Sequence, residues 1–299
     1  MNPTDNQTND PTVPINPINP AEPINPVEPV IEDVSKSTKS YIVQNDKKFI
    51  ALYVLLLIGC VIGAIYMPNL FQFWISIAVI VGVAGYNHIR SKIKRQFTQQ
   101  FGASIGFSYV ASAGMESVSG RLFKFGHSQA IYDVLSGRMN DRDSRIYSYR
   151  FTIGSGRNSH TYNFTVFEST FANMMPDIML TAKTSMFAAE SLPGGVFMFD
   201  KDEHVEMEGD FNKYFTVRVP KGFETEAYQI LPPDVMTDLI DQASGLNFEF
   251  NGNKLYIYAA KLVTVRGELQ RMFDLAEYLS GLFSRSTRAV NVPPAVAGQ

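Results

Sequence analysis

A glycine-rich stretch carries the residues of this chain best suited to binding a ligand. It reads Gly154-Ser155-Gly156-Arg157-Asn158-Ser159-His160, so a guanidinium, an amide and an imidazole stand close together. A phosphate-binding loop would need a lysine and a helix directly after the glycines, whereas a strand-like pattern follows here. We therefore predict a hairpin turn whose Arg157, Asn158 and His160 are the candidate ligand-binding residues, because exposed loops often carry binding groups.

Two other patterns resemble chemical sites. Gly102-Ala103-Ser104-Ile105-Gly106 matches G-x-S-x-G, but that nucleophile motif needs a strand before the serine and a helix after it, and the order here is reversed. His204, Glu206 and Glu208 would share one face of a strand and could bind zinc or a hard metal ion. An acidic, solvated strand face explains them more simply, because no second ligand cluster accompanies them. The sequence predicts no catalytic residue, no metal site and no cofactor.

The element that must position the rest of the chain is a long uncharged stretch. Residues 49–89 contain no Asp, Glu, Lys or Arg, and Met67-Pro68-Asn69-Leu70 interrupts them once. A charge at the centre of a membrane helix costs roughly 2.5–3.5 kcal/mol, so a charge-free run of this length is typical of a membrane segment. We predict a hairpin of two transmembrane helices, over residues 49–67 and 71–89, within a segment that covers residues 47–89.

Basic residues on both sides of this hairpin predict its orientation. Lysine and arginine are enriched on the cytoplasmic side of membrane helices. The connecting loop has none, and the flanking ones are Lys36, Lys39, Lys47 and Lys48 before the first helix and Arg90, Lys92, Lys94 and Arg95 after the second. We predict a multi-pass membrane protein with both termini in the cytoplasm.

Small residues at four-residue spacing occur in both apolar helices. Gly59 and Gly63 form a GxxxG pattern, and Ala78 and Gly82 form the looser small-xxx-small pattern. Such spacing lets two helix backbones approach closely. It could mediate dimerisation, but we favour packing of the two helices within one hairpin, since the motif is frequent among membrane helices.

The N-terminal arm, residues 1–46, is rich in proline. Proline recurs at every third position from Pro11 to Pro29. A polyproline II helix has three residues per turn, so these prolines would share one edge of an extended rod without a core. The arm could bind an aromatic-lined groove of a partner protein, but no Arg or Lys flanks the repeat, and a solvated spacer is favoured. We predict that residues 1–46 are disordered or extended.

The segment after the hairpin, residues 90–106, is predicted to be a basic juxtamembrane helix. Ile89, Ile93, Phe97 and Phe101 recur every four residues, which places them on one helix face. That stripe could lie along the anionic membrane surface or pack on the domain that follows, and the pattern fits both alternatives.

Residues 107–285 are predicted to form one cytoplasmic α+β domain with a mainly antiparallel sheet and two helices. Short runs of alternating residues are typical of strands, and the first three predict a meander. The predicted strands cover residues 130–138, 145–153, 160–167, 178–182, 196–199, 204–208 and 215–219.

The end of this domain combines a hairpin with the two helices. Asn251-Gly252 separates two further alternating runs and is the strongest hairpin signal in the chain. Apolar residues at helical spacing predict helices over residues 232–243 and 266–283. Residues 286–299 are predicted to be a flexible tail.

Composition excludes one class of function. The chain has 299 residues, a formal net charge of −3 and 18% charged residues, without the basic field that a nucleic-acid-binding protein needs. Its one cysteine, Cys60, lies in the first apolar segment, so the domain cannot form an intrachain disulfide. This fits a reducing compartment.

Several motifs after the uncharged hairpin resemble those of a known family. They are Ser119-Gly120-Arg121-Leu122-Phe123, the segment 149–160 that begins Tyr149-Arg150-Phe151, Gly209-Asp210-Phe211-Asn212-Lys213-Tyr214-Phe215 and Ile230-Leu231-Pro232-Pro233. In this order the chain resembles a bacterial family of uncharacterised membrane-anchored proteins, domain of unknown function 3137, over about residues 49–262. The resemblance implies a protein of the bacterial inner membrane, and it implies no activity.

We therefore expect a membrane-tethered interaction or ligand-binding module without catalytic activity. Its partners would be the lipid bilayer and a protein that binds the proline-rich arm or the domain, and not a nucleic acid. The alternative is a membrane-bound enzyme whose site gathers sequence-distant residues such as His160, Asp133, Glu206 or Arg157.

Overall fold

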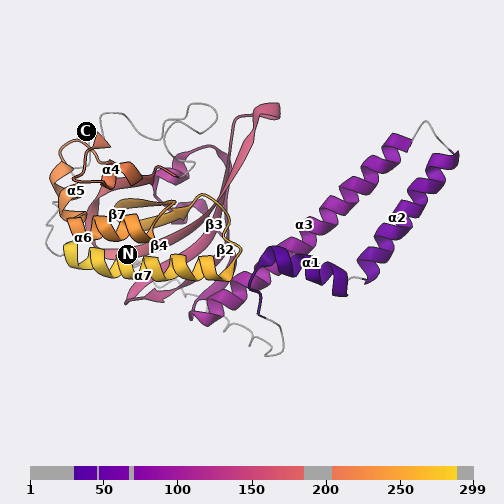
Figure 1. Cartoon of the computed structure of the whole chain (residues 1–299), viewed down its shortest axis with the longest axis horizontal. Coiled ribbons are helices and arrows are strands. Elements are labelled where there is room, and N and C mark those ends of the chain that lie inside the picture. Colours follow the sequence, from indigo (N-terminus) through magenta and orange to yellow (C-terminus); the bar gives the residue numbers. More distant parts are fainter. Residues whose placement is uncertain (1–29, 46, 67–70, 185–203, 288–299) are drawn as a thin grey trace, which may run out of the picture.

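An antiparallel sheet of seven strands forms the body of the molecule (Figure 1). The computed structural model describes residues 30–45, 47–66, 71–184 and 204–287. The strands are β1 Ser108–Ala113, β2 His127–Met139, β3 Arg142–Ile153, β4 His160–Ala182, β5 His204–Val205, β6 Phe215–Arg218 and β7 Leu246–Ala259. Together with the helices that cover the sheet, they confirm the predicted α+β class with a mainly antiparallel sheet.

Strands β2, β3 and β4 form the meander that the alternating pattern predicts, and β1, which was not predicted, extends it beside β2. Neighbouring strands from β1 to β4 pair antiparallel. Asn140 and Asp141 connect β2 to β3 with φ angles of 51° and 61°, the left-handed conformation that a two-residue type I′ turn requires. Strand β4 joins the two strands predicted over residues 160–167 and 178–182 into one, because β3 pairs with its first half and β6 with its end. The strand predicted over residues 196–199 lies outside the described residues.

Strand β7 shows that the predicted hairpin at Asn251-Gly252 was wrong. Residues 246–259 form one strand that pairs with β4 on both sides of this dipeptide. Gly252 has a φ angle of 59°, and the pairing is irregular around Met175 of β4. The dipeptide therefore forms a bulge and not a chain reversal. Its local turn preference is overridden because β4 offers hydrogen-bonding partners to both halves of β7.

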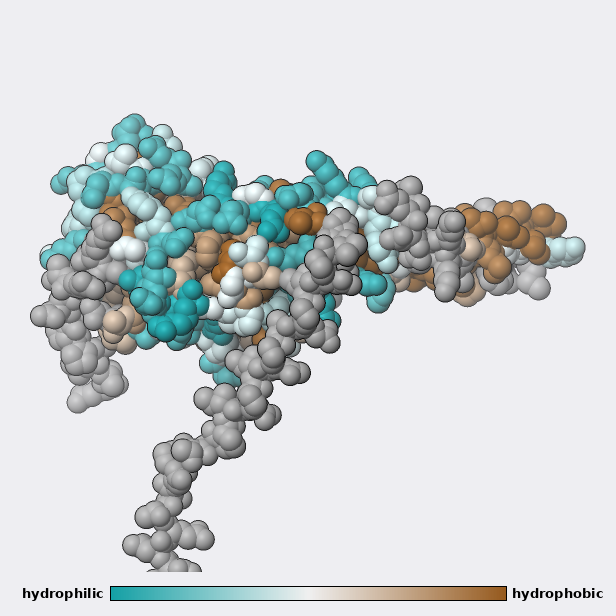
Figure 2. Space-filling view, turned by 90° about the horizontal axis from the view of Figure 1, so that it is seen from below, coloured by the Kyte–Doolittle hydropathy of each residue, from teal (hydrophilic) through white to brown (hydrophobic). Residues whose placement is uncertain are grey.

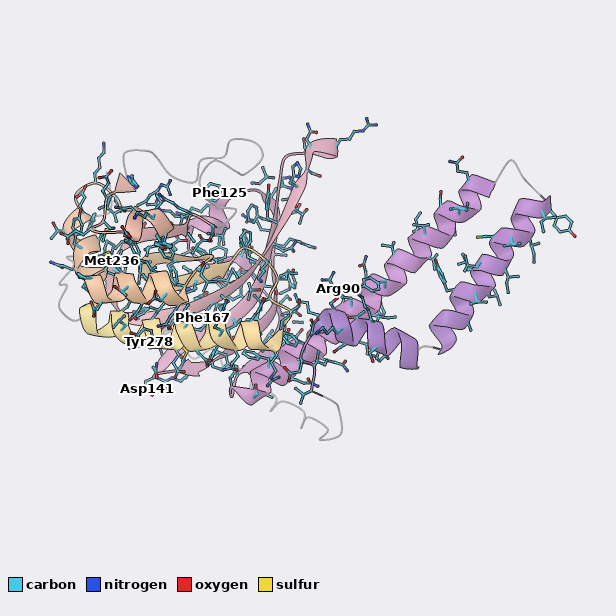
Figure 3. All side chains as sticks on the ribbon, viewed as in Figure 1. Arg90, Phe125, Asp141, Phe167, Met236 and Tyr278 are labelled. Atoms are coloured by element: carbon cyan, nitrogen blue, oxygen red, sulfur yellow. The ribbon has the colours of Figure 1, made fainter. Side chains whose placement is uncertain are left out.

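Helices cover one face of the sheet. They are α4 Phe211–Tyr214, α5 Glu224–Ile230, α6 Pro233–Gln242 and α7 Arg266–Thr287. Helices α6 and α7 confirm the two predicted helices, whereas α4 and α5 were not predicted. Phe167 of β4 and Met236 of α6 belong to the large apolar core between the sheet and these helices (Figure 3). Helix α7 extends slightly into the predicted tail, and residues 288–299 lie outside the described residues.

The opposite face of the sheet carries a second, aromatic core. Tyr147, Tyr149 and Phe151 alternate along β3 and are buried there, as core and not as an exposed stacking surface. The segment between β1 and β2, residues 114–126, covers this face and is called the covering segment below. It contains two 3-10 helices, η2 Met115–Ser117 and η3 Arg121–Lys124.

Two long antiparallel helices, α2 Lys47–Tyr66 and α3 Phe71–Ser104, extend away from the sheet as a hairpin (Figure 1). The helices lie where the uncharged stretch predicts them. In the parts of the chain that the structure describes, no helix has both the length and the apolar character needed to cross a membrane. The transmembrane character of the hairpin stays a prediction.

Helix α3 continues without a break from the hairpin into the domain, so the helix predicted over residues 90–106 is the continuation of the second hairpin helix and ends at Ser104. Ile89, Ile93, Phe97 and Phe101 are each at most 5% exposed and belong to the large core. The stripe packs on the domain and not along a membrane surface. The sheet accepts it because the stripe is apolar and the facing strand surface is apolar too.

Helix α1, Val34–Asn45, shows that the disorder predicted for residues 1–46 was wrong at its end. Asp33 caps this helix, because its Oδ1 accepts the backbone N–H of Ser35 at 2.7 Å. The Val34 N–H donates to the Thr264 carbonyl at 3.0 Å, and the Val34 side chain is fully buried. The proline repeat itself lies outside the described residues.

Candidate functional site

The predicted ligand-binding residues lie at an exposed turn. Arg157 and Asn158 belong to a short 3-10 helix, η4 Gly156–Asn158, and His160 begins β4. All three residues are exposed, at the tip of the ribbon formed by β3 and β4 (Figure 1). The structure brings them together, but a ligand at this tip would stay in contact with water, which weakens polar recognition.

The residues of the enzyme alternative are not gathered in one place. Strand pairing puts Asp133 on β2 next to the part of β3 that faces Thr165 of β4, about 17 Å along the sheet from His160 at ~3.3 Å per residue. Glu206 follows β5, whose partner β6 pairs with the far end of β4. Arg157 lies at the turn beside His160. The four side chains therefore occupy separate parts of the sheet.

The two other sequence patterns hold no chemical site. Among the described residues, no group of three His, Cys, Asp or Glu side chains could hold a metal ion, so His204, Glu206 and Glu208 do not form one. Ser104 ends helix α3, and its Oγ donates to the Phe101 carbonyl at 2.7 Å. A strand follows this serine, which is the reverse of the nucleophile motif.

The small residues of the hairpin differ in their surroundings. A Cβ on Gly82 would lie 2.9 Å from Cε2 of Tyr53, so α2 and α3 approach closely there. A Cβ on Gly59 would meet nothing within 4 Å, and this glycine is exposed. Gly63 is half-buried, and the side chain of Ala78 lies outside the described residues. Close packing within the hairpin thus involves Gly82 and not Gly59.

A buried carboxylate that sequence reasoning missed lies on the aromatic face of the sheet. Glu168 is 3% exposed, and its carboxylate contacts Arg145 Nη2 at 2.7 Å and Lys254 Nζ at 2.8 Å. The hydroxyl of Tyr147 donates to it at 3.1 Å. Both cations also donate to the Ser117 carbonyl, at 2.9 and 3.0 Å. This network fixes the covering segment to the sheet.

A second missed carboxylate, Glu249 of β7, is enclosed beneath the same segment. It is 1% exposed and accepts hydrogen bonds from the Arg121 N–H and the Tyr258 hydroxyl. Burial raises the pKa of Glu249 to about 7, although the backbone N–H groups of η3 favour the ionised form. A Cβ on Gly120 would lie 3.0 Å from its Oε2, so a larger residue at this position would force the carboxylate or the covering backbone to shift.

One sequence signal could have revealed the first of these carboxylates. Tyr162, Phe164, Val166 and Glu168 occupy every second position of β4 and share one face, and the first three are apolar. A charge on an apolar strand face predicts a buried, paired group. Because its carboxylate oxygens are occupied by protein donors, Glu168 holds the covering segment and is not free to act on a substrate.

A further charge pair joins helix α3 to the sheet. Lys94 Nζ contacts Asp133 Oδ2 at 3.0 Å and donates to Ser148 Oγ at 3.0 Å, and the Tyr109 hydroxyl donates to Asp133 at 3.0 Å. Burial lowers the pKa of Lys94, and the neighbouring Asp133 opposes that change. Asp133 has a φ angle of 54° at an irregularity of β2. The pair fixes the direction in which α3 leaves the domain.

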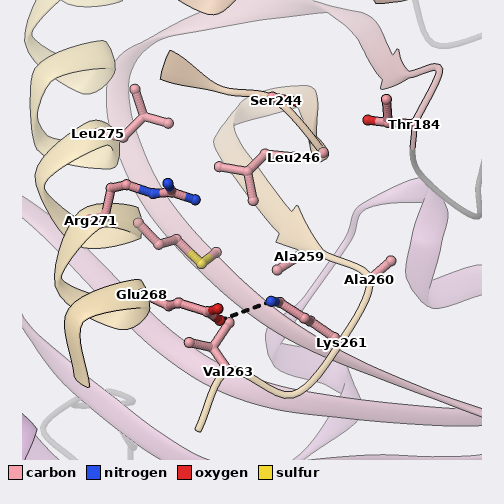
Figure 4. Close-up of a pocket in the computed structure, with 12 residues that line it drawn as sticks. Thr184, Ser244, Leu246, Ala259, Ala260, Lys261, Val263, Glu268, Arg271 and Leu275 are labelled. Carbon is pink, nitrogen blue, oxygen red and sulfur yellow. Dashed lines mark ion pairs between the residues drawn. The ribbon is translucent and has the colours of Figure 1, made fainter. Parts of the chain in front are cut away.

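A cavity between helix α7 and the end of β7 is open to solvent on one side and could hold a small molecule. It measures about 330 Å³, within the size range of ligand sites. Its lining combines apolar side chains with three charged ones (Figure 4), and comprises Thr184, Ser244, Gly245, Leu246, Ala259, Ala260, Lys261, Val263, Glu268, Arg271, Met272 and Leu275. No local pattern predicts it, because its lining comes from a helix, a strand end and the loops beside them, which only the fold brings together.

Comparisons with known proteins identify no relative by sequence. No family model matches the chain, and no curated protein matches it. Among solved structures, the fold is similar to the crystal structure of the mycobacterial trehalose monomycolate transport factor A, TtfA, with a TM-score of 0.47 and 10% identity. That match covers 67% of this chain and 98% of the other. A likeness this distant identifies neither a family nor an activity, and the family resemblance stays a prediction.

Proposed function

We propose that this chain is a bacterial inner-membrane protein whose helical hairpin enters the bilayer and holds a cytoplasmic, non-enzymatic binding domain at its surface. The observation that carries the proposal is the apolar surface of the hairpin, seen in brown at the far end of the molecule in Figure 2. Its large exposed side chains are Val54, Leu55, Leu57, Ile58, Val61, Ile62 and Ile65 on α2 and Phe73, Ile75, Val79, Ile80 and Val83 on α3.

Lipid accounts for this surface better than a protein partner does. Removing apolar surface from water is favourable by about 25 cal/mol of free energy per Å². Soluble monomers therefore rarely expose apolar patches above a few hundred Å². At about 100° per residue, the exposed positions span roughly 160° on each helix. A single partner helix would cover one stripe of such a surface, whereas lipid can surround it.

Contacts at the base of the hairpin support the proposed orientation. The Ile31 N–H donates to Gln100 Oε1 at 2.9 Å, and Lys92 lies over the Tyr41 ring at 5.9 Å from its centroid. The chain before the hairpin thus lies beside the part of α3 that packs on the domain. Both ends of the hairpin leave on the same side, as expected if both termini are cytoplasmic.

Helix α3 would act as a rigid connection between membrane and domain. It has 34 residues, a length of about 51 Å at ~1.5 Å per residue. Its apolar stripe and the pair of Lys94 with Asp133 are both embedded in the domain. The domain would therefore present its surfaces at a fixed distance from the bilayer, where it binds a protein partner or a ligand, with the proline-rich arm as spacer or second contact.

Flotation of the full chain with lipid vesicles tests the tether. We expect the wild type to float and to resist alkaline carbonate. A variant with Ile58→Lys, Ile62→Lys and Val79→Lys should lose flotation, because each central charge costs roughly 2.5–3.5 kcal/mol. Val110→Lys, at an exposed apolar position of β1, is the matched control and should float. Wild-type protein that stays in the supernatant without detergent would contradict the proposal.

A further inference from the structure

Arg271 is the positive charge of the cavity beside α7 that has no counter-ion among the residues that the structure describes. Arg271 points from α7 into the space between this helix and β7 (Figure 4). Lys261 and Glu268 pair with each other at 2.9 Å, so their charges cancel. In the described part of the chain, no carboxylate lies within ion-pair distance of Arg271. The cavity therefore carries a net positive charge and would attract an anion.

The remaining wall of the cavity is apolar. Met272 and Leu275 of α7 are each 5% exposed, and Val263 is 7% exposed. Leu246, at the start of β7, faces them across the cavity (Figure 4). Such surface gains free energy from contact with an apolar group of a ligand. An inorganic anion would leave it uncovered.

We propose that this cavity binds a small amphipathic anion, with an oxyanion head on Arg271 and a short alkyl tail on Met272, Leu275 and Val263. A guanidinium matches carboxylate and phosphate heads equally, since both accept two parallel hydrogen bonds. A volume of about 330 Å³ holds roughly ten non-hydrogen atoms at ~30 Å³ each. This inference deepens the binding role proposed above and rests on it for the ligand's source at the membrane.

Calorimetric titration of the full chain in lipid nanodiscs tests the inference, with empty nanodiscs as the baseline. Octanoate and octyl phosphate distinguish the two head groups, acetate provides a head without a tail, and 1-octanol a tail without a head. We expect saturable binding of octanoate or octyl phosphate, and binding at least about tenfold weaker for acetate and for 1-octanol.

Three variants locate the binding site. Arg271→Gln should weaken binding about tenfold or more, because it removes the charged donor. Arg150→Gln removes an exposed arginine of β3 and should leave binding unchanged. Ala260→Phe should block the tail by filling the cavity while it preserves the charges, and so provides a second result if Arg271→Gln unfolds.

The possible outcomes separate this inference from the membrane proposal. Failure of octanoate and octyl phosphate to bind, or equal binding by wild type and Arg271→Gln, would overturn the inference. So would equal weakening by Arg150→Gln, which would show a general effect of charge and not a site at Arg271. Vesicle flotation that succeeds alongside such results would leave the tether intact, whereas failed flotation with Arg271-dependent binding would overturn the tether alone.

Discussion

Replacing Glu249 by Gln tests whether an ionisable group is enclosed beneath the segment that covers the aromatic face. The amide keeps the shape of the side chain, can accept from the Arg121 N–H and can donate to the Tyr258 oxygen. Burial raises the pKa of Glu249 from 4.5 to about 7, with Arg121 opposing the increase and Asp177 adding to it. The substitution removes the titrating proton while it keeps the hydrogen bonds.

The sign of the pH dependence follows from this raised pKa. The folded chain binds the proton more tightly than the unfolded chain, so the stabilisation is complete below pH 4.5 and is lost as the pH rises to about 7. One pKa unit corresponds to about 1.4 kcal/mol, so the loss is at most about 3.5 kcal/mol. The side chain of the Gln variant stays neutral, so this contribution to its free energy of unfolding does not change over this pH range.

Urea unfolding of the detergent-solubilised full chain at a series of pH values measures the effect. Subtracting the wild-type profile from that of Glu249→Gln cancels the other titrating groups. The difference should grow from near zero at acidic pH to about 3.5 kcal/mol in favour of the variant above pH 7. Glu116→Gln, an exposed position in the same segment, is the matched control. A flat difference for Glu249→Gln, or the same trend for Glu116→Gln, would refute the enclosed carboxyl.

Substitutions at Gly82 and Gly120, with Gly59 as a control, test the close contacts of the fold. Gly82→Leu should lower the unfolding temperature in detergent, because its Cβ would lie 2.9 Å from the Tyr53 ring, whereas Gly59→Leu should not. If detergent-solubilised Gly59→Leu had a lower molecular mass than the wild type, the dimerisation alternative would be supported instead. Gly120→Ala should destabilise the fold by about 1–3 kcal/mol in urea, since its Cβ would lie 3.0 Å from Glu249 Oε2. An unchanged urea midpoint would contradict that packing.

Sequence periodicity was sufficient to predict those strands and helices that bury one face against an apolar core. Tyr147, Tyr149 and Phe151 alternate in sequence, and all three are buried on the same face of β3. The helix over residues 232–243 was predictable because proline at its start and its apolar spacing agree with each other. Local preference and tertiary packing favour the same structure in both cases.

Prediction failed where tertiary pairing outweighs a local preference. Asn251-Gly252 favours a turn by itself, yet Asn251 Nδ2 donates to Asp177 Oδ1 at 3.0 Å, and β7 continues along β4. Pro176 lies within the irregular part of β4, where the ladder is already interrupted. The irregularities around Gly252 of β7 and Met175 of β4 are defined only by the pairing of these two strands. Patterns within a single segment therefore could not predict them.

The stripe on helix α3 shows a second kind of limit. Burying an apolar helix face is favourable both in lipid and against a sheet, so the sequence pattern cannot identify which of the two covers it. The group that distinguishes the two cases is Lys94, which lies next to that face. At a membrane surface its charge would stay in water. Here it is buried, pairs with Asp133 and donates a hydrogen bond to Ser148. A basic residue beside an apolar stripe therefore indicates domain packing only when a partner carboxylate exists. That partner lies 39 residues further along the chain, beyond the reach of local patterns.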